Sequence, residues 1–243
     1  MEKVLVTGVA GQLGYDVVRA LEKRNIEAIG VDIADFDLTD ENAVMAYVGK
    51  VRPAAIVHCA AYTAVDKAED NEEAAYAVNV LGTRHIARAA RSTDAKLMYI
   101  STDYVFDGDK KGRYDADDAK NPQGVYGRTK YQGELECQSQ TDKLFIVRLS
   151  WVFGRNGSNF VKTMLRLSET RKEINVVTDQ TGSPTYTPDA AELICDMIAT
   201  EKYGAYQVSN EGECSWWEFA KETMELAGKE TAILPITAAE YAA

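Results

Sequence analysis

The sequence predicts an α/β fold, in which a doubly wound parallel sheet carries a smaller C-terminal lobe. Two observations support this prediction. Over the first 150 residues, five short apolar runs alternate with helical segments, and strands that alternate with helices form parallel sheets. Beyond that point the alternation loosens into shorter elements joined by loops. We therefore expect one domain over residues 1–150 and, over residues 151–243, a substrate-binding lobe that also returns elements to the sheet.

The composition of the chain limits its class and its partners. The 243 residues are 46% hydrophobic and 27% charged, as in globular proteins with a sizeable core. The net charge of −11 argues against nucleic-acid and anionic-membrane partners, because both bind basic surfaces. No apolar run approaches the roughly 18 residues of a membrane span, and a strand begins at once, without a signal peptide. The scattered cysteines favour a reduced, cytoplasmic setting.

A glycine motif follows the first predicted strand, residues 4–6. Gly8, Gly11 and Gly14 lie three residues apart, and a helix with an apolar face comes next. A strand, a glycine turn and a helix in this order are typical of a dinucleotide-binding (Rossmann) domain, because amides at the helix start bind phosphate. We expect Gly8 to permit the turn, Gly11 to admit the pyrophosphate, and Gly14 to allow close packing of the helix.

An acidic residue, Asp32, ends the second predicted strand, residues 27–31. It stands 18 residues beyond Gly14, where a carboxylate accepts hydrogen bonds from ribose hydroxyls and repels a 2′-phosphate. We therefore expect NADH as the cofactor and leave NADPH open. In the segment that follows, Thr39 is expected to cap the N-terminus of a helix.

The third predicted strand, residues 54–59, ends in two alanines. Small side chains at the carboxyl end of a strand let a cofactor lie against the backbone. One long helix is expected over residues 71–91, with Asn79 in a structural role. The only histidines are His58 and His85, and neither has a companion at metal-ligand spacing. The sequence therefore predicts no metal site.

A hydroxyl, a phenol and an amine come together after the fourth predicted strand, residues 96–101. Thr102 follows this strand, and the helix expected over residues 125–138 carries Tyr126 and Lys130 on one face, four residues apart. We expect the lysine ammonium, together with the positive nicotinamide ring of an oxidised cofactor, to lower the pKa of the tyrosine. Tyr126 would then exchange a proton with a carbonyl oxygen, to which Thr102 donates a hydrogen bond. The segment predicts reduction of a carbonyl group.

The remaining elements are shorter and are predicted from local signals. A strand is expected over residues 143–149, an amphipathic helix over residues 159–170 and a short strand over residues 174–177. Thr187 is expected to cap a further helix that has Pro188 at its first position. A capping box from Ser215 to Glu218 opens a last helix, which reaches Ala227.

Several segments together carry a resemblance to a known family. They are 60–69 (AAYTAVDKAE), 101–108 (STDYVFDG), 125–130 (VYGRTK), 148–154 (RLSWVFG), 159–166 (NFVKTMLR) and 179–184 (DQTGSP). In these segments the chain resembles the extended short-chain dehydrogenases/reductases and, more narrowly, the dTDP-4-dehydrorhamnose reductases. The resemblance covers nearly the whole chain.

The resemblance implies NAD(P)H-dependent reduction of the C4 keto group of dTDP-4-dehydro-L-rhamnose, in dTDP-rhamnose biosynthesis. The catalytic residues that it implies are Thr102, Tyr126 and Lys130. The residues implied to bind the cofactor are Gly8, Gly11, Gln12, Leu13, Gly14, Asp32, Asp37, Leu38, Ala60, Ala61, Tyr62, Thr63, Tyr126 and Lys130. The residues implied to contact the sugar are Thr102, Asp103, Tyr126 and Trp151.

Other activities of related proteins can be weighed against this one. Sugar-nucleotide 4,6-dehydratases carry Thr-Asp-Glu after the strand, whereas this chain has Tyr104 in place of the glutamate, which favours reduction over dehydration. Two alternatives stay open. One is a non-catalytic regulatory subunit of the kind that partners methionine adenosyltransferase, which the intact catalytic residues disfavour. The other is a reductase or epimerase of another nucleotide sugar.

Three further properties stay open at this point. The family continues past residue 243 with an Arg-Pro segment that helps to bind the substrate, so the contacts of the substrate diphosphate are not assigned. His58 stands where relatives often carry asparagine. A Mg²⁺ requirement and the choice between a homodimer and a monomer are not decided by any acidic cluster or other feature of the sequence.

Overall fold

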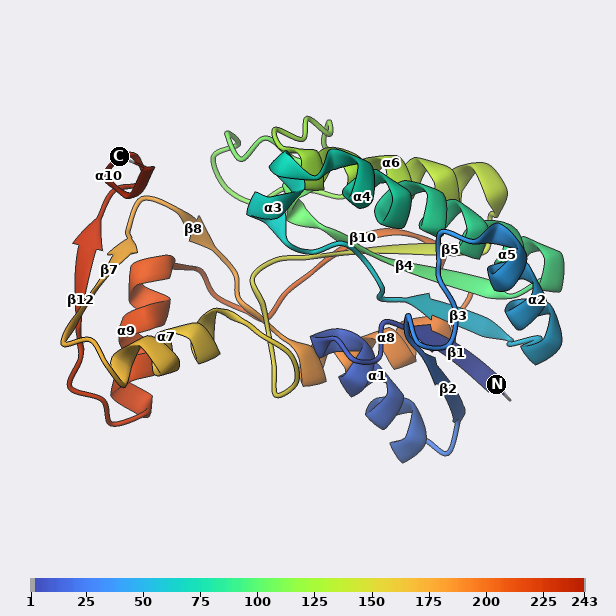
Figure 1. Ribbon diagram of the computed structural model, residues 1–243, viewed down its shortest axis with the longest axis horizontal. Coiled ribbons are helices and arrows are strands. Elements are labelled where there is room, and N and C mark those ends of the chain that lie inside the picture. Colours follow the sequence, from blue (N-terminus) through green and yellow to red (C-terminus); the bar gives the residue numbers. More distant parts are fainter. Residues whose placement is uncertain (1–2, 243) are drawn as a thin grey trace.

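The computed structural model describes residues 3–242 and has a larger and a smaller part (Figure 1). The larger part is a six-stranded sheet in the order β10-β5-β4-β3-β1-β2, and its paired strands are all parallel. The strand order reverses between β1 and β3, and ligands of such sheets bind at the carboxyl ends of the strands beside this point. The predicted doubly wound α/β fold is confirmed.

The strands of the sheet follow the apolar runs of the sequence. They are β1 (Lys3–Thr7), β2 (Glu27–Val31), β3 (Ala55–His58), β4 (Lys96–Thr102), β5 (Leu144–Leu149) and β10 (Gly204–Val208). β3 and β5 are buried along their whole length, as expected for inner strands with helices on both faces. The first five agree with the predicted strands to within one residue at each end, whereas β10 comes from the C-terminal part of the chain.

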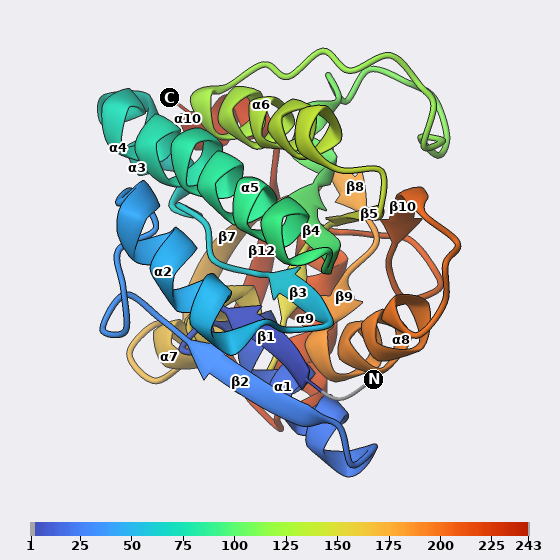
Figure 2. The ribbon, with the colours of Figure 1, turned by 90° about the vertical axis from the view of Figure 1, so that its right-hand side faces the viewer.

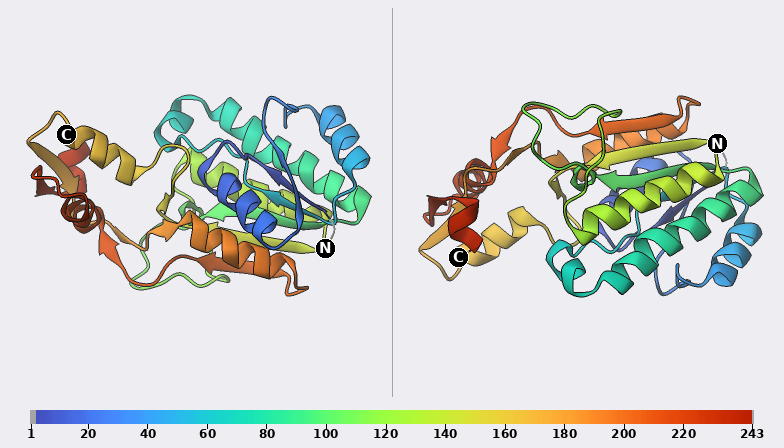
Figure 3. Two further views of the ribbon diagram at one scale, coloured as in Figure 1. Left: turned by 90° about the horizontal axis from the view of Figure 1, so that it is seen from below. Right: turned by 90° about the horizontal axis from the view of Figure 1, so that it is seen from above.

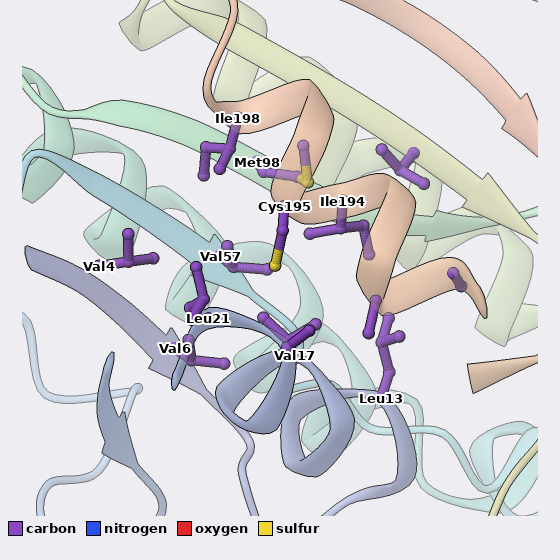
Figure 4. Packing of buried hydrophobic residues seen from close by; sticks show 14 of the residues in the cluster. Val4, Val6, Leu13, Val17, Leu21, Val57, Met98, Ile194, Cys195 and Ile198 are labelled. Carbon is purple, nitrogen blue, oxygen red and sulfur yellow. The ribbon is translucent and has the colours of Figure 1, made fainter. Parts of the chain in front are cut away.

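Helices cover both faces of the sheet (Figure 2). On one face lie α1 (Gln12–Lys23) and α8 (Thr187–Ile198), and on the other lie α2 (Glu41–Val51), α5 (Thr83–Thr93) and α6 (Val125–Gln140). Under the first pair, Leu13 and Val17 pack with Ile194 against Val57 and Met98 of the sheet (Figure 4). This packing joins segments from the two ends of the chain into one hydrophobic core.

The helix predicted over residues 71–91 is interrupted by a π-helical turn. The segment consists of α4 (Glu72–Tyr76), the π-helical turn Ala77–Gly82 and then α5. The buried Asn79 lies in this turn, where its side chain accepts from the Tyr62 amide at 2.8 Å and donates to the Thr129 hydroxyl at 3.1 Å. The extra residue of a π turn is often found at functional sites. A short helix that the sequence did not predict, α3 (Val65–Asp70), precedes it.

The smaller part is a lobe with its own core at one end of the molecule (Figure 3). It contains α7 (Phe160–Ser168), β7 (Glu173–Val177), β8 (Thr181–Gly182), β11 (Cys214–Ser215), α9 (Trp216–Leu226), β12 (Ala232–Ile236) and α10 (Ala238–Ala242). Met164, Ile174, Val176, Ala220 and Met224 form its buried cluster. Two-residue strands, β6 (Val152–Phe153) and β9 (Thr185–Tyr186), pair where the chain leaves and re-enters the larger part.

The C-terminal part of the chain does not stay within this lobe. After β9 the chain returns to the larger part as α8 and β10, and β10 pairs with β5 to complete the sheet. The division of the chain at residue 150 stays a prediction. Within residues 3–242, no helix combines the length and the apolarity that crossing a bilayer requires.

Two predicted helix caps are wrong, and the structure gives the reason for each. Asp40, rather than Thr39, caps α2, because its carboxylate accepts from two backbone amides of the first turn. Thr187 does not cap α8, since its hydroxyl donates instead to the buried Asp16 carboxylate at 2.6 Å. The capping box that opens α9 is confirmed.

Candidate active site

A cleft of about 720 Å³ opens at the carboxyl ends of the sheet strands, beside the point where the strand order reverses. Each residue assigned from the sequence to the cofactor, the substrate or catalysis lies on its wall. These residues are Gly8, Gly11, Gln12, Leu13, Gly14, Asp32, Asp37, Leu38, Ala60, Ala61, Tyr62, Thr63, Thr102, Asp103, Tyr126, Lys130 and Trp151. The structure thus brings them together, while their individual roles stay predictions.

The glycine turn between β1 and α1 leaves no room for side chains. Gly8 has φ +70°, and a Cβ there would lie 2.7 Å from the Ala60 backbone nitrogen. A Cβ on Gly14 would collide with the Gly8 carbonyl oxygen. Gly11 is the N-cap of α1 and supplies no side-chain cap, and the first turn carries no acidic residue. The amides and the positive end of this helix therefore fit an anionic ligand such as a diphosphate.

The carboxylate of Asp32 is held beside the glycine turn. Its Oδ2 accepts from the Ala10 amide at 2.9 Å, and its Oδ1 accepts from the Ile33 amide at 2.9 Å. Residues 32–40 include no lysine or arginine. This wall of the cleft is acidic. Asp37 keeps its charge because hydrogen bonds from the amide and the hydroxyl of Thr39 lower its pKa.

The phenol of Tyr126 lies in the first turn of α6, with its ring edge-on to that of Tyr104 at 5.6 Å between centroids. Burial raises the pKa of Tyr126, and the charge of Asp103 raises it further, while the Thr102 hydroxyl acts in the opposite direction. The pKa of Tyr126 thus moves opposite to the lowering expected from the Lys130 ammonium, while the contribution expected from an oxidised nicotinamide ring stays a prediction. Desolvation is the larger effect, because it disfavours a buried phenolate.

The Lys130 side chain reaches from α6 towards the end of β4. Its Nζ donates to the Ile100 carbonyl oxygen at 2.7 Å and lies 4.1 Å from the centroid of the Tyr99 ring. Burial lowers the pKa of Lys130 to about 8, against the opposing effects of Cys137 and Glu134. The ammonium is therefore the major form at pH 7. One of its three N–H groups is used by Ile100, which leaves donors for a ligand.

Thr102 and Asp103 complete the site at the end of β4. The Thr102 hydroxyl donates to Asp103 Oδ1 at 3.1 Å and accepts from the Tyr104 amide at 3.2 Å. Burial raises the pKa of Asp103 to about 6. The chain thus places a hydroxyl, a phenol, an ammonium and a carboxyl group of raised pKa around one end of the cleft, as the sequence predicted for the first three.

A buried ion pair beneath this site was not predicted. Arg148 of β5 binds Glu134 of α6 through two hydrogen bonds of 2.7 and 2.8 Å. Glu134 also accepts from the Ser101 hydroxyl at 2.5 Å, and Arg148 donates to the Ala116 carbonyl at 3.0 Å. A sequence signal exists, since an arginine within a strand that is otherwise apolar needs a buried partner.

His58 lies between β1 and α5, close to the cleft wall. Its Nδ1 is 2.8 Å from the Thr7 hydroxyl and its Nε2 is 3.2 Å from the Thr83 hydroxyl. Thr7 also accepts from the Ala60 amide at 3.1 Å. Burial, and then the charge of Lys130, lowers the pKa of His58 to about 3. The histidine is therefore a neutral bridge. Among the residues that the structure describes, no three His, Cys, Asp or Glu side chains gather as a metal-binding group.

Trp151 follows β5 after one intervening residue, has φ +45° and lines the cleft. Its ring stacks on that of Trp216, with centroids 3.5 Å apart and planes 10° apart. Trp216 was not singled out from the sequence, where it belongs only to a capping box. No local pattern reveals that two indoles 65 residues apart will stack.

The glycine turn, the acidic wall and the hydroxyl, phenol and ammonium around one cleft define a nicotinamide-dependent oxidoreductase of the short-chain type. Within that class, the chain belongs to the dTDP-4-dehydrorhamnose reductase family, and the family model described as "RmlD substrate binding domain" matches residues 1–243. The family predicted from the sequence is confirmed.

Similar proteins span almost the whole chain. The spore coat polysaccharide biosynthesis protein SpsK of Bacillus subtilis is 43% identical over 99% of this chain and 85% of its own length. The dTDP-4-dehydrorhamnose reductase of Aggregatibacter actinomycetemcomitans is 40% identical over 90% of this chain and 77% of its own length. Among solved structures, the dTDP-4-dehydrorhamnose reductase from Bacillus anthracis in complex with NADP superposes with a TM-score of 0.97 at 45% identity, over 100% of this chain and 86% of that one.

Proposed function

We propose that this protein reduces the C4 keto group of dTDP-4-dehydro-L-rhamnose to give dTDP-L-rhamnose. Membership of the reductase family supports the proposal, since relatives that match 90% and 100% of this chain carry that name. The observation that carries it is the convergence of Thr102, Tyr126 and Lys130 on one end of a glycine-lined cleft. These are the groups that a carbonyl reduction needs on the protein side.

The residues of the cleft favour a nicotinamide dinucleotide as the hydride donor. When bound, the reduced nicotinamide supplies the hydride that reaches C4. The uncapped start of α1 would hold the diphosphate through Gly11, Gln12 and Leu13. Asp32 would accept from the adenosine ribose hydroxyls, and the lack of a basic residue nearby supports NADH rather than NADPH. The relative solved with NADP makes this preference the point to test.

Tyr126 is suited to give the proton that the new alkoxide needs. The phenol has an ordinary pKa of about 10, which burial raises further, so it carries its proton at neutral pH and can donate it to the C4 oxygen. Lys130, as an ammonium, would donate to the nicotinamide ribose hydroxyls through the N–H groups that Ile100 does not use, while Tyr126 is left as a phenolate. In the reverse direction the same phenolate would accept the proton from the C4 hydroxyl.

Three residues are proposed to position the sugar. Thr102 would turn its hydroxyl from Asp103 towards the C4 oxygen and stabilise charge on it. Asp103 and Trp151 line the same end of the cleft. Asp103 would bind a sugar hydroxyl, and the indole would cover the apolar side of the deoxysugar.

The site disfavours dehydration, because Tyr104 stands where a dehydratase has its glutamate and presents an aromatic ring to Tyr126. The intact catalytic groups also disfavour a purely regulatory subunit. Incubation with NADH or NADPH and dTDP-4-dehydro-L-rhamnose should consume the reduced cofactor and yield one equivalent of dTDP-L-rhamnose. No consumption with either cofactor would sink the proposal, and faster turnover of another nucleotide sugar would change the substrate.

A further inference from the structure

The backbone of Trp151 is held in an unfavourable conformation. Its φ of +45° is rare for any residue other than glycine and costs of order 1 kcal/mol. Two hydrogen bonds hold it there, since the Ser150 hydroxyl donates to the Ser183 carbonyl at 2.7 Å and the Thr185 amide donates to the Trp151 carbonyl at 3.2 Å. Such conformations persist where the surroundings fix them and cluster at ligand sites.

The indole of Trp151 lies in a slot between Trp216 and Gly182. One face of the ring stacks on Trp216 at 3.5 Å. At Gly182 an added Cβ would lie 2.6 Å from Trp151 Cε2, so the slot closes on any residue larger than glycine. β8 and β11 place the two walls side by side, because Gly182 pairs with Cys214 and Trp216 follows β11 as the first residue of α9.

The slot belongs to the lobe, whereas Trp151 belongs to the sheet. Trp216 is backed by Phe160 of α7, with ring centroids 4.6 Å apart, and packs on the edge of the lobe core. Trp151 is separated from the end of β5 by Ser150 alone, and it lines the cleft. Stacked aromatic pairs prefer defined geometries, so the lobe sets the orientation of a ring that faces the substrate end of the cleft.

We propose that Trp216 and Gly182 are positioning residues for the nucleotide sugar, which act by fixing the Trp151 indole before the substrate binds. The inference rests on the proposed function, in which Trp151 contacts the sugar. Ordering a free side chain on binding costs about 0.5–1.5 kcal/mol. A ring already held in its slot avoids this cost. Neither Trp216 nor Gly182 is among the residues assigned to the dinucleotide, so we expect the effect to fall on the sugar.

The test compares Trp216→Ala and Trp216→Phe with the matched control Trp217→Phe. Trp217 is the neighbouring indole of α9 and donates to the Ile233 carbonyl at 2.9 Å, away from the slot. The affinity of dTDP-L-rhamnose, the KM values of keto sugar and NADH, and the circular dichroism couplet of two stacked indoles are measured for each. Trp216→Ala should weaken sugar binding about 10-fold at unchanged NADH KM. Trp216→Phe should restore most of the affinity, and both should lose the couplet that Trp217→Phe retains.

Three outcomes would overturn the inference. They are a wild-type protein without the couplet, a Trp216→Ala variant with unchanged sugar affinity, and equal losses for the sugar and for NADH, which would mark a merely structural role. Failure of the proposed function looks different. A protein that binds dTDP-L-rhamnose in a Trp216-dependent way, yet oxidises no NADH, supports the slot and rejects the reductase. A protein that binds no dTDP-sugar rejects both.

Discussion

At the scale of single residues, burial decides how the catalytic groups hold their protons. The phenol of Tyr126 has a raised pKa and the ammonium of Lys130 has a pKa lowered to about 8, each because desolvation disfavours its charged form. At pH 7 both groups carry their protons. The site is therefore set for the direction in which a carbonyl oxygen gains a proton.

Replacing the phenol tests this role directly. In Tyr126→Phe the ring and its packing against Tyr104 remain, while the proton donor is lost. We expect kcat to fall about 10²–10⁴-fold, with the dissociation constant of NADH within about 2-fold of the wild type. Stopped-flow turnover and NADH fluorescence titration measure the two quantities. Equal losses of binding and rate would show that Tyr126 is structural.

His58 makes the fold sensitive to acid. Its pKa is about 3 in the folded protein against 6.5 in a free chain, so below pH 6.5 the unfolded state binds a proton that the folded state does not. Stability is therefore lost as the pH falls from 6.5 towards 3, by roughly 2 kcal/mol at pH 5.

The variant His58→Asn, whose amide can take the place of Nδ1 towards Thr7, removes this proton linkage. Urea unfolding at pH 7 and pH 5 should show a smaller pH effect in His58→Asn than in the wild type. His85→Gln, which keeps His58, serves as the control and should retain the full effect. An unchanged pH dependence in His58→Asn would contradict the assignment.

The site residues that sequence reasoning found are those with a local signature. Glycine spacing, an acidic strand end and a tyrosine four residues before a lysine are all readable along the chain. Trp216, Arg148 and the bonds of His58 act through contacts between distant segments. The pKa of Tyr126 was also misjudged, because spacing indicates which charges are near but not how completely water is excluded.

At the scale of elements, β5 and the helix α6 that carries Tyr126 and Lys130 are joined by the buried pair Arg148–Glu134, and Ser101 of β4 donates to the same glutamate. Both side chains are almost inaccessible, with 2% and 1% of their surface exposed. Removing one member leaves an uncompensated buried charge, so Arg148→Met should lower the free energy of unfolding by about 3–5 kcal/mol.

A second ion pair on α6 provides the control for this prediction. Arg84 binds Glu136 through two similar hydrogen bonds, but 31% and 22% of these side chains are exposed. Arg84→Met should therefore cost less, about 1 kcal/mol. Chemical denaturation of both variants makes the comparison, and equal losses would mean that burial of Arg148 does not set its contribution.

The acidic end of β2 gives a prediction about cofactor choice. In Asp32→Ser the repulsion of a 2′-phosphate is removed and the bonds to the ribose hydroxyls are weakened. The ratio of kcat/KM for NADH over NADPH should fall at least about 10-fold. Asp35→Asn, which removes a charge from the same loop while its amide oxygen can still accept from the Asp32 amide, is the control and should leave the ratio near its wild-type value. A wild-type preference for NADPH would refute the assignment of Asp32.

The elements with strong periodic patterns were predicted well, and the others were not. Buried strands read as apolar runs, and this fixed β1 to β5 to within one residue. The π-helical turn and the two-residue strands depend on tertiary contacts, such as the bonds of Asn79 to Tyr62. The cap at Thr39 failed because the adjacent aspartate competes for the same amides and accepts two of them.

At the scale of the whole molecule, two separate cores predict two levels of local stability. The sheet and its helices bury large clusters, whereas the lobe buries a smaller one. Native-state hydrogen exchange should show faster exchange in β7 and α9 than in β4 and β5. Saturating NADH should slow exchange in the larger part by an amount set by its affinity. Uniform protection across both parts would indicate one cooperative unit.

The path of the chain between the two parts has a consequence for engineering and for descent. Because residues 187–208 return to complete the sheet as α8 and β10, the lobe is built from two stretches of sequence that flank this return. A recombination event with a single crossover before β6 therefore transplants the lobe only together with α8 and β10, so a foreign strand then pairs with β5. Chimeras that exchange the lobe alone need further junctions at the borders of α8 and β10, and their aromatic slots must come from one parent.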